Sequence, residues 1–181
     1  PARCAILPDH FTPNKDIASA NQVRGSRLFA REMGMRFWET GRCGVEHAMI
    51  PESGLVLPGD IVVGADSHTC TGGALSALAT GMGSTDLAYA WALGEVWPRV
   101  PETIRVEHQG KLSPWTTGKD VILDPIGRLG VEGARYMAIE FAGEALAARP
   151  MAARCTMATL AIQAARQAGA FGPAGARHGP R

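Results

Sequence analysis

The segment IVVGADSHTCTGGALSALATG, residues 61–81, places several reactive side chains directly after an apolar run. Asp66, Ser67 and His68 offer a carboxylate, a hydroxyl and an imidazole at three consecutive positions. A carboxylate beside an imidazole raises the pKa of the ring and fixes its tautomer, so that the ring can donate a proton near neutral pH. This pattern predicts acid–base chemistry at the turn.

Two further segments carry the same residue types after an apolar run. Asp9 and His10 follow CAIL, and His47 lies in GRCGVEH, which follows MRFWE. We therefore expect one catalytic site formed by Asp9, His10, His47, Asp66, Ser67 and His68. Such a set suits protonation of a poor leaving group such as hydroxide. The glycines of TCTGG would let backbone amides approach an anionic substrate.

Three functional hypotheses fit these residues. The first is a hydro-lyase that acts on a hydroxy-di- or tricarboxylate. The second is a zinc-dependent hydrolase that uses His47, Asp66 and His68 as ligands. The third is a non-catalytic α/β domain, a relic or an interaction module, because an Asp-His pair after a strand is also common in turns and Asp66 could simply cap the next segment. The occurrence of all six residues at strand ends favours chemistry.

Short apolar runs alternate with helical patterns along the chain. Strands are predicted over residues 4–7, 35–39, 60–65 and 102–112. Helices are predicted over 14–33 with Asn14 as cap, 72–97 with a break at residues 81–83 and a new cap at Ser84, 117–130, 133–148 and 153–169. This order predicts an α/β fold, a layered α/β/α domain with a largely parallel sheet. Ligands of such sheets bind at the carboxyl ends of the strands, where the six residues fall.

Composition restricts the class of protein. The chain has 181 residues, 46% of them hydrophobic and 19% charged, with a net charge of +1, which predicts a soluble, cytoplasmic protein without a nucleic-acid surface. It contains no apolar run near the roughly 18 residues of a membrane span, so no membrane contact is expected. The four cysteines form no CxxC motif, which suits a reducing compartment.

Several longer stretches extend over residues 8–169: PDHFTPNKD, GVEHAMIPESGLVLPGDIVVGADSHTCTGGALSALATGMGSTDLA, VPETI, WTTGKDVIL and YMAIEFAGEAL. They resemble the aconitase superfamily, and within it the 3-isopropylmalate dehydratase large subunits, with the homoaconitases next. The resemblance implies a partial aconitase-like α/β/α domain over residues 1–169. Residues 170–181, rich in Gly, Pro, Ala and Arg, are expected to form a disordered tail. We expect a fragment of a large subunit that is inactive alone.

The same resemblance implies an activity and its partners. It implies a hydro-lyase of leucine biosynthesis with a small hydroxy-dicarboxylate substrate and a small, swivelling-domain subunit as partner. One iron of a 4Fe-4S cluster acts as Lewis acid in the family. By resemblance, His10 of the Asp9-His10 pair is the acid toward the departing hydroxyl. Asp66, Ser67 and His68 would face the substrate and the water on that iron.

The cysteines and the C-terminal segment depart from the family pattern. The family's cluster ligands lie in downstream motifs that are absent here, so all four cysteines are expected to be small packed thiols: Cys4, Cys43, Cys70 and Cys155. Thr159 stands where the family has Asn, and Gln163 stands where it has a Glu that would support His47. Because Gln carries no charge, we expect weaker proton transfer at His47, and proton transfer typically contributes roughly 10²–10⁴-fold to catalysis.

Overall fold

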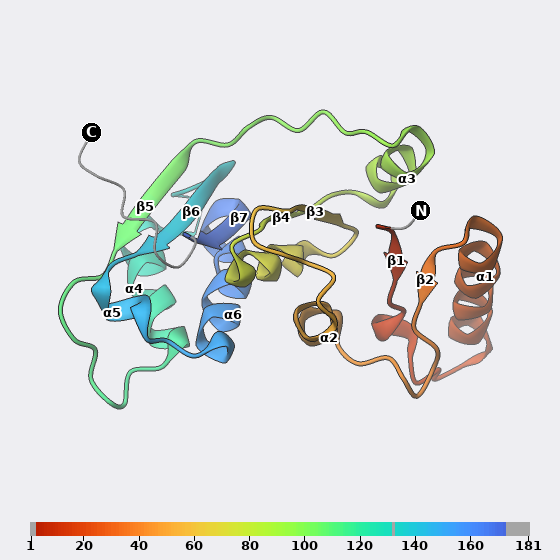
Figure 1. Ribbon diagram of the computed structural model, residues 1–181, viewed down its shortest axis with the longest axis horizontal. Helices are drawn as coiled ribbons and strands as arrows, with labels where there is room; N and C mark the ends of the chain where they lie inside the picture. The colour runs from red at the N-terminus through yellow and green to blue at the C-terminus, as the bar shows by residue number, and fades with distance from the viewer. Residues whose placement is uncertain (1–2, 132, 173–181) are drawn as a thin grey trace.

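The computed structural model describes residues 3–131 and 133–172, and its helices and strands follow one another along an elongated molecule (Figure 1). The N-terminal elements are β1 (Ala5–Ile6), the 3-10 helix η1 (Asp9–Phe11), α1 (Ile17–Met33), β2 (Arg36–Phe37) and α2 (Glu46–Ser53). The central elements are β3 (Ile61–Gly64), the 3-10 helix η2 (Ser67–Leu75), β4 (Leu78–Gly81) and α3 (Ser84–Leu93). The C-terminal elements are β5 (Thr103–Glu107), α4 (Gly118–Leu129), β6 (Met137–Ala142), α5 (Glu144–Ala147), α6 (Met151–Leu160), α7 (Ile162–Ala165) and β7 (Arg166–Phe171).

Every strand pair is parallel, which confirms the predicted α/β class. The strands do not form one sheet, however, but three: β1-β2, β3-β4 and β5-β6-β7. The β3-β4 pair remains separate because η2 packs against both β4 and β7 (Figure 1). None of the helices in the described ranges is long and apolar enough to cross a membrane.

The predicted helix over residues 72–97 is wrong in its first half. Instead, η2 continues to Leu75 and is followed by β4, which pairs with β3. Gly73 of η2 lies so close to Gly169 of β7 that a Cβ at residue 73 would overlap the carbonyl of Gly169. Tertiary packing therefore overrides the helical propensity of this segment. The N-cap of α3 is Gly83, not Ser84.

The two C-terminal helical predictions are also wrong in part. Residues 137–142 form β6, the central strand of its sheet, in which Ile139 and Phe141 are buried in the core and Glu140 between them is partly exposed. Residues 166–171 form β7, which pairs with β6. The strand thus includes two residues of the predicted disordered tail, Ala170 and Phe171. Residues 173–181 lie outside the described part.

The helices over 14–33 and 117–130 are confirmed, with one corrected cap. Asp16, and not Asn14, begins α1: its Oδ1 accepts a hydrogen bond from the backbone N–H of Ser19 at 2.7 Å. Thr117 and Asp120 make the equivalent capping box of α4. Both helices begin at residue types that satisfy otherwise unpaired backbone donors.

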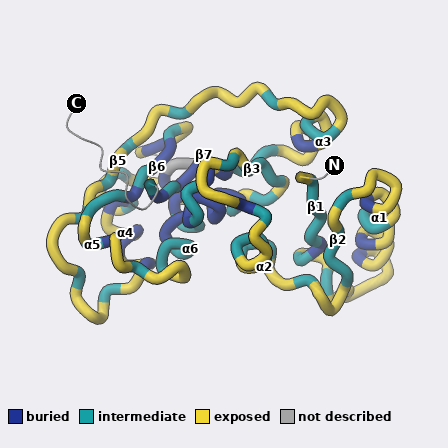
Figure 2. The backbone as a smooth tube through the Cα atoms, in the orientation of Figure 1, coloured by how far each residue is buried: buried dark blue, intermediate teal, exposed yellow. Residues whose placement is uncertain are grey.

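The main core lies between the three-stranded sheet and helices α4 and α6. Its largest fully buried side chains are Ile122, Ile139 and Met157, and the buried rings of Phe141 and Phe171 lie in a tilted arrangement with centroids 5.2 Å apart. Figure 2 shows buried residues gathered here and along η2, whereas α2 is only partly covered. The core therefore supports η2, which carries the central part of the candidate site.

Candidate active site

Asp66 lies at the centre of the site, in the turn between β3 and η2. Its Oδ1 accepts a hydrogen bond from the backbone N–H of His68 at 2.7 Å, so that Asp66 caps η2. Thr69 Oγ1 donates to the carbonyl of Asp66 at 2.6 Å. Gly81 of β4 approaches that same carbonyl so closely that a Cβ there would overlap it. The turn is thus fixed by its own hydrogen bonds and by β4.

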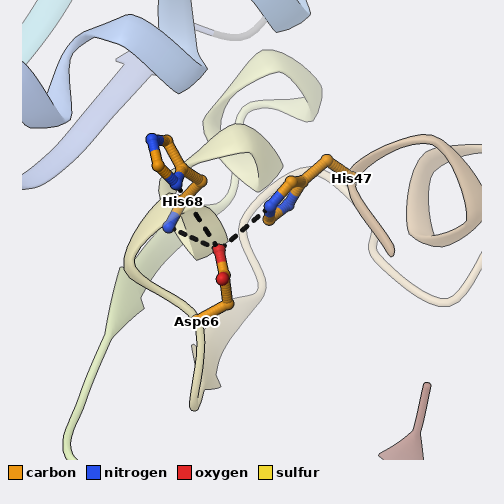
Figure 3. A group of neighbouring side chains, drawn as sticks. All are labelled: His47, Asp66 and His68. Atoms are coloured by element: carbon orange, nitrogen blue, oxygen red, sulfur yellow. Dashed lines mark hydrogen bonds and ion pairs between the residues drawn. The ribbon is translucent and has the colours of Figure 1, made fainter. Parts of the chain in front are cut away.

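Three imidazoles surround the carboxylate of Asp66. Its Oδ1 lies 3.0 Å from His47 Nε2 and 3.7 Å from His68 Nδ1. Its Oδ2 lies 3.7 Å from His10 Nε2. In Figure 3, His47 and His68 point toward Asp66 from two sides, one from α2 and the other from η2. The structure thus brings together residues from three separate segments of the sequence.

Asp9 connects the η1 segment to α2. Its Oδ1 lies 2.7 Å from His10 Nδ1, and its Oδ2 accepts a hydrogen bond from the backbone N–H of Glu46 at 2.8 Å. The hydrogen bond to Asp9 raises the pKa of His10. Burial acts to raise the pKa of Asp9, but its bonds to the Glu46 N–H and to His10 outweigh burial and lower it. Asp9 and His10 therefore favour the ion-pair form, with His10 as proton donor.

Ser67 and His68 face a cavity of about 540 Å³. Ser67 Oγ lies 3.1 Å from His68 Nδ1. The other residues that line the cavity are Ala65, Gly81, Met82, Gly83, Ile162 and Gln163. All six predicted residues are thus in one neighbourhood, and Ser67 and His68 contact open space large enough for a small organic acid.

The sequence placed Gln163 at the position that supports His47. In the structure, Gln163 instead lines the cavity together with His68. His47 is not among the residues that line this cavity, and its Nε2 contacts Asp66 instead. The reason is the position of α7: it follows α6, which packs on η2, so Gln163 reaches the start of η2 and not α2. The partner assigned to His47 from the sequence is therefore wrong.

Glu46 is a site residue that the sequence reasoning missed. Burial, together with the nearby charges of Asp66 and Asp9, raises the pKa of Glu46 to about 7. Its Oε1 lies 3.5 Å from Nδ1 of His47, whose pKa is lowered mainly by burial. His47 therefore lies between two carboxyl groups. The position of Glu46 directly before His47 in GVEH was the available indication, and it is ambiguous because such a residue can equally face solvent.

Thr159 joins α6 to η2 and does not contact the imidazoles. Thr71 Oγ1 donates to the carbonyl of His68 at 2.7 Å, so the hydroxyl of Thr159, 2.7 Å away, must donate to Thr71. The carbonyl of Thr159 also accepts from Cys70 Sγ at 3.7 Å. At this position, the departure from the family's Asn is accommodated by a hydrogen bond within the scaffold.

We expect Thr159→Val to lower the free energy of unfolding by about 1 kcal/mol, because it removes one hydrogen bond while Thr71 keeps its bond to His68. Thr159→Ser retains the hydroxyl and serves as the matched control. Urea unfolding of the parent and the two variants measures the difference. Equal loss in both variants would show that the methyl group, and not the hydrogen bond, is important.

The described cysteines do not fit a 4Fe-4S cluster. All four are free thiols, and three of them are only partly buried: Cys4, Cys43 and Cys155. Burial raises the pKa of Cys70 to about 11, which disfavours the thiolate that cluster iron requires. Among the residues that the structure describes, the metal-binding side chains that converge are His47, Asp66 and His68, with no cysteine.

The fold and site together define a parallel α/β protein in which imidazoles and carboxylates converge near the ends of its strands. The sequence model of the aconitase family (aconitate hydratase) matches residues 10–176. The chain belongs to the aconitase family, which implies a 4Fe-4S cluster.

Curated relatives carry the name "3-isopropylmalate dehydratase large subunit". One from Moorella thermoacetica is 59% identical over 172 residues, which are 94% of this chain and 41% of that protein. One from Desulfatibacillum aliphaticivorans is 58% identical over 172 residues, with the same coverage. A "large subunit 1" from Pyrococcus furiosus is 56% identical over 174 residues, 96% of this chain and 41% of the relative. The chain therefore spans about two fifths of the length of these relatives.

Proposed function

We propose that this chain supplies the proton-transfer part of a hydro-lyase large subunit of the 3-isopropylmalate dehydratase type. The observation that carries the proposal is the convergence of three imidazoles on Asp66, each from a segment that matches the family. The substrate would be a small hydroxy-dicarboxylate, and the partner would be the small subunit that the name "large subunit" implies.

In this proposal the residues have separate roles. His10, which is held by Asp9 and has a raised pKa, donates the proton to the departing hydroxyl. Ser67 and His68 border the cavity, where the substrate would bind. Asp66 orients His47 and His68 and balances the positive charge that a protonated imidazole carries. These residues would protonate the hydroxyl as its C–O bond breaks. The proton lost from the adjacent carbon, as the double bond forms, would go to a separate base elsewhere in the large subunit.

We further infer that the thiolate ligands of the family's cluster lie outside this chain, because the described cysteines do not converge. The chain alone should therefore show no measurable dehydration of 3-isopropylmalate. The zinc-hydrolase hypothesis uses the same His47, Asp66 and His68, but membership of the aconitase family favours the hydro-lyase.

A chimera tests the proposal. Residues 3–172 of this chain replace the matching segment of the Moorella large subunit, and dehydration of 3-isopropylmalate is measured with that relative's small subunit. We expect activity reduced by roughly 10²–10⁴-fold relative to the Moorella enzyme and raised again by Gln163→Glu, since a carboxylate that lines the same cavity as His68 would support proton transfer.

The Moorella enzyme itself is the positive control, and Gln163→Leu in the chimera is the matched negative control. If the folded chimera remains inactive with Gln163→Glu, the segment does not supply the acid–base groups. In that case the non-catalytic hypothesis would be favoured.

A further inference from the structure

His47, Asp66 and His68 present one ligand atom each within 4.8 Å of one another (Figure 3). We propose that these three side chains bind a single zinc ion in this chain. Two imidazole nitrogens and one carboxylate oxygen are a donor set that zinc accepts. The proposal goes beyond the hydro-lyase function, because ion binding by this segment requires neither substrate nor turnover. A bound ion would occupy the same groups to which charge balance is assigned above, so the two uses alternate and do not coincide.

The spacing of the ligand atoms fits a tetrahedral ion. Zinc binds imidazole nitrogen and carboxylate oxygen at about 2.0–2.2 Å, which places neighbouring ligand atoms about 3.3–3.5 Å apart. Asp66 Oδ1 lies 3.0 Å from His47 Nε2 and 3.7 Å from His68 Nδ1, on either side of that separation. Binding would draw the three ligand atoms, which lie within 4.8 Å of one another, to that separation.

Asp66 is held in place before any ion binds. Its Oδ1 accepts from the backbone N–H of His68 at 2.7 Å, which is the capping interaction of η2. A carboxylate oxygen has further lone pairs, so the cap and an ion can share this oxygen. The ion would therefore bind to a fixed carboxylate at the start of a fixed helix.

A carboxyl group lies near the ring nitrogen of His47 that would not bind the ion. Glu46 Oε1 lies 3.5 Å from His47 Nδ1, on the opposite side of the ring from Nε2. A carboxylate at one ring nitrogen holds the proton there and leaves the other nitrogen free as a ligand. The 3.5 Å separation is an ion-pair distance, longer than a hydrogen bond of good geometry, so Glu46 favours this tautomer through its charge alone.

The cavity beside His68 has room for a water molecule or an anion as the fourth ligand of the ion. Ser67 Oγ lies 3.1 Å from His68 Nδ1, and both residues line the 540 Å³ cavity. Three protein ligands with space for water or an anion are typical of an open zinc site. The His68 side chain is 38% exposed and that of Asp66 is 18% exposed, so an ion can enter without unfolding.

The experiment measures zinc binding to the purified 181-residue chain. Metal analysis after equilibrium dialysis should give one zinc per chain, and Co²⁺ should give the visible absorption of a tetrahedral site without a thiolate charge-transfer band. We expect His47→Ala and His68→Ala to weaken zinc binding strongly. The loss should exceed the roughly 10–100-fold that is typical when a group contacting a ligand residue, and not the metal, is removed. Glu46→Ala should weaken zinc binding within that roughly 10–100-fold range.

His10→Ala is the matched control, because His10 also faces Asp66 but on Oδ2. The zinc affinity of His10→Ala should stay within about twofold of the parent value. This is well below the roughly 10–100-fold effect of removing a group that contacts a ligand residue. Asp66→Asn keeps a capping side chain and tests the carboxylate if the alanine variants fold poorly. Absence of zinc binding, a thiolate band, or equal affinity in the parent, His47→Ala and Asp66→Asn would overturn the proposal. These results involve no turnover, so they are separate from a failure of the hydro-lyase proposal.

Discussion

Asp66→Asn should lower dehydratase activity of the chimera that carries Gln163→Glu by roughly 10²–10⁴-fold, with little loss of stability. Asn caps a helix about as well as Asp, so the hydrogen bond from the His68 N–H is retained. What is lost is the negative charge 3.0 Å from His47 Nε2. Since this charge opposes the effect of burial, its removal should lower the pKa of His47 further and leave fewer protonated rings.

Steady-state kinetics and thermal unfolding of the same preparations measure this prediction. Asp66→Ala is the companion variant, because it loses the cap as well as the charge and should also cost about 1 kcal/mol of stability. If Asp66→Asn stays within threefold of the parent activity, Asp66 is only a structural cap. The proposed role of its charge would then be wrong.

Glu46→Gln should make the chain more stable at pH 8 and leave it little changed at pH 5. Glu46 has a pKa of about 7 in the folded chain, against an ordinary value of 4.5, because its buried carboxyl lies near Asp66 and Asp9. Between these values the folded chain holds a proton that the unfolded chain has lost. The contribution of Glu46 to stability therefore falls as the pH rises from 4.5 through 7, and it is lowest above pH 7.

The shift corresponds to about 3 kcal/mol at most, and partial exposure of the carboxyl reduces the expected gain to about 1–2 kcal/mol at pH 8. Urea unfolding of parent and variant at the two pH values measures the gain. Glu52→Gln, an exposed position on the same helix, is the matched control. A gain of equal size at pH 5 and pH 8 would contradict a raised pKa as its cause.

The site could be predicted better than the elements that support it. Asp9, His10, His47, Asp66, Ser67 and His68 were identified from residue type and position after apolar runs, and the structure places them together. Asp9 and Asp66 closely follow short strands, whereas His47 lies within α2, ten residues after β2 ends, so the family resemblance was needed as well as residue type. Gln163 was paired with the wrong imidazole because its neighbours depend on how α6 packs on η2, a contact between distant segments.

The errors in the fold have a related cause. The segments that form β6 and β7 lie in longer Ala-rich runs, whose sequences are compatible with helices as well as with strands. Only the pairing of Ile139 with Ile104 on one side and Gly169 on the other determines the outcome. The high pKa of Glu46 likewise depends on two carboxylates from other segments, Asp9 and Asp66, and not on its immediate neighbours.

The close approach of Gly73 to Gly169 determines when, during synthesis, η2 can complete its packing. The backbone of η2 rests on β7, and these two glycines are 96 residues apart in the chain. At about 5–20 residues per second, the ribosome adds Gly169 about 5–20 s after Gly73. During this interval η2, which follows the Asp66 turn, has no β7 to pack against. The packing of η2 on β7 can form only after β7 has left the exit tunnel.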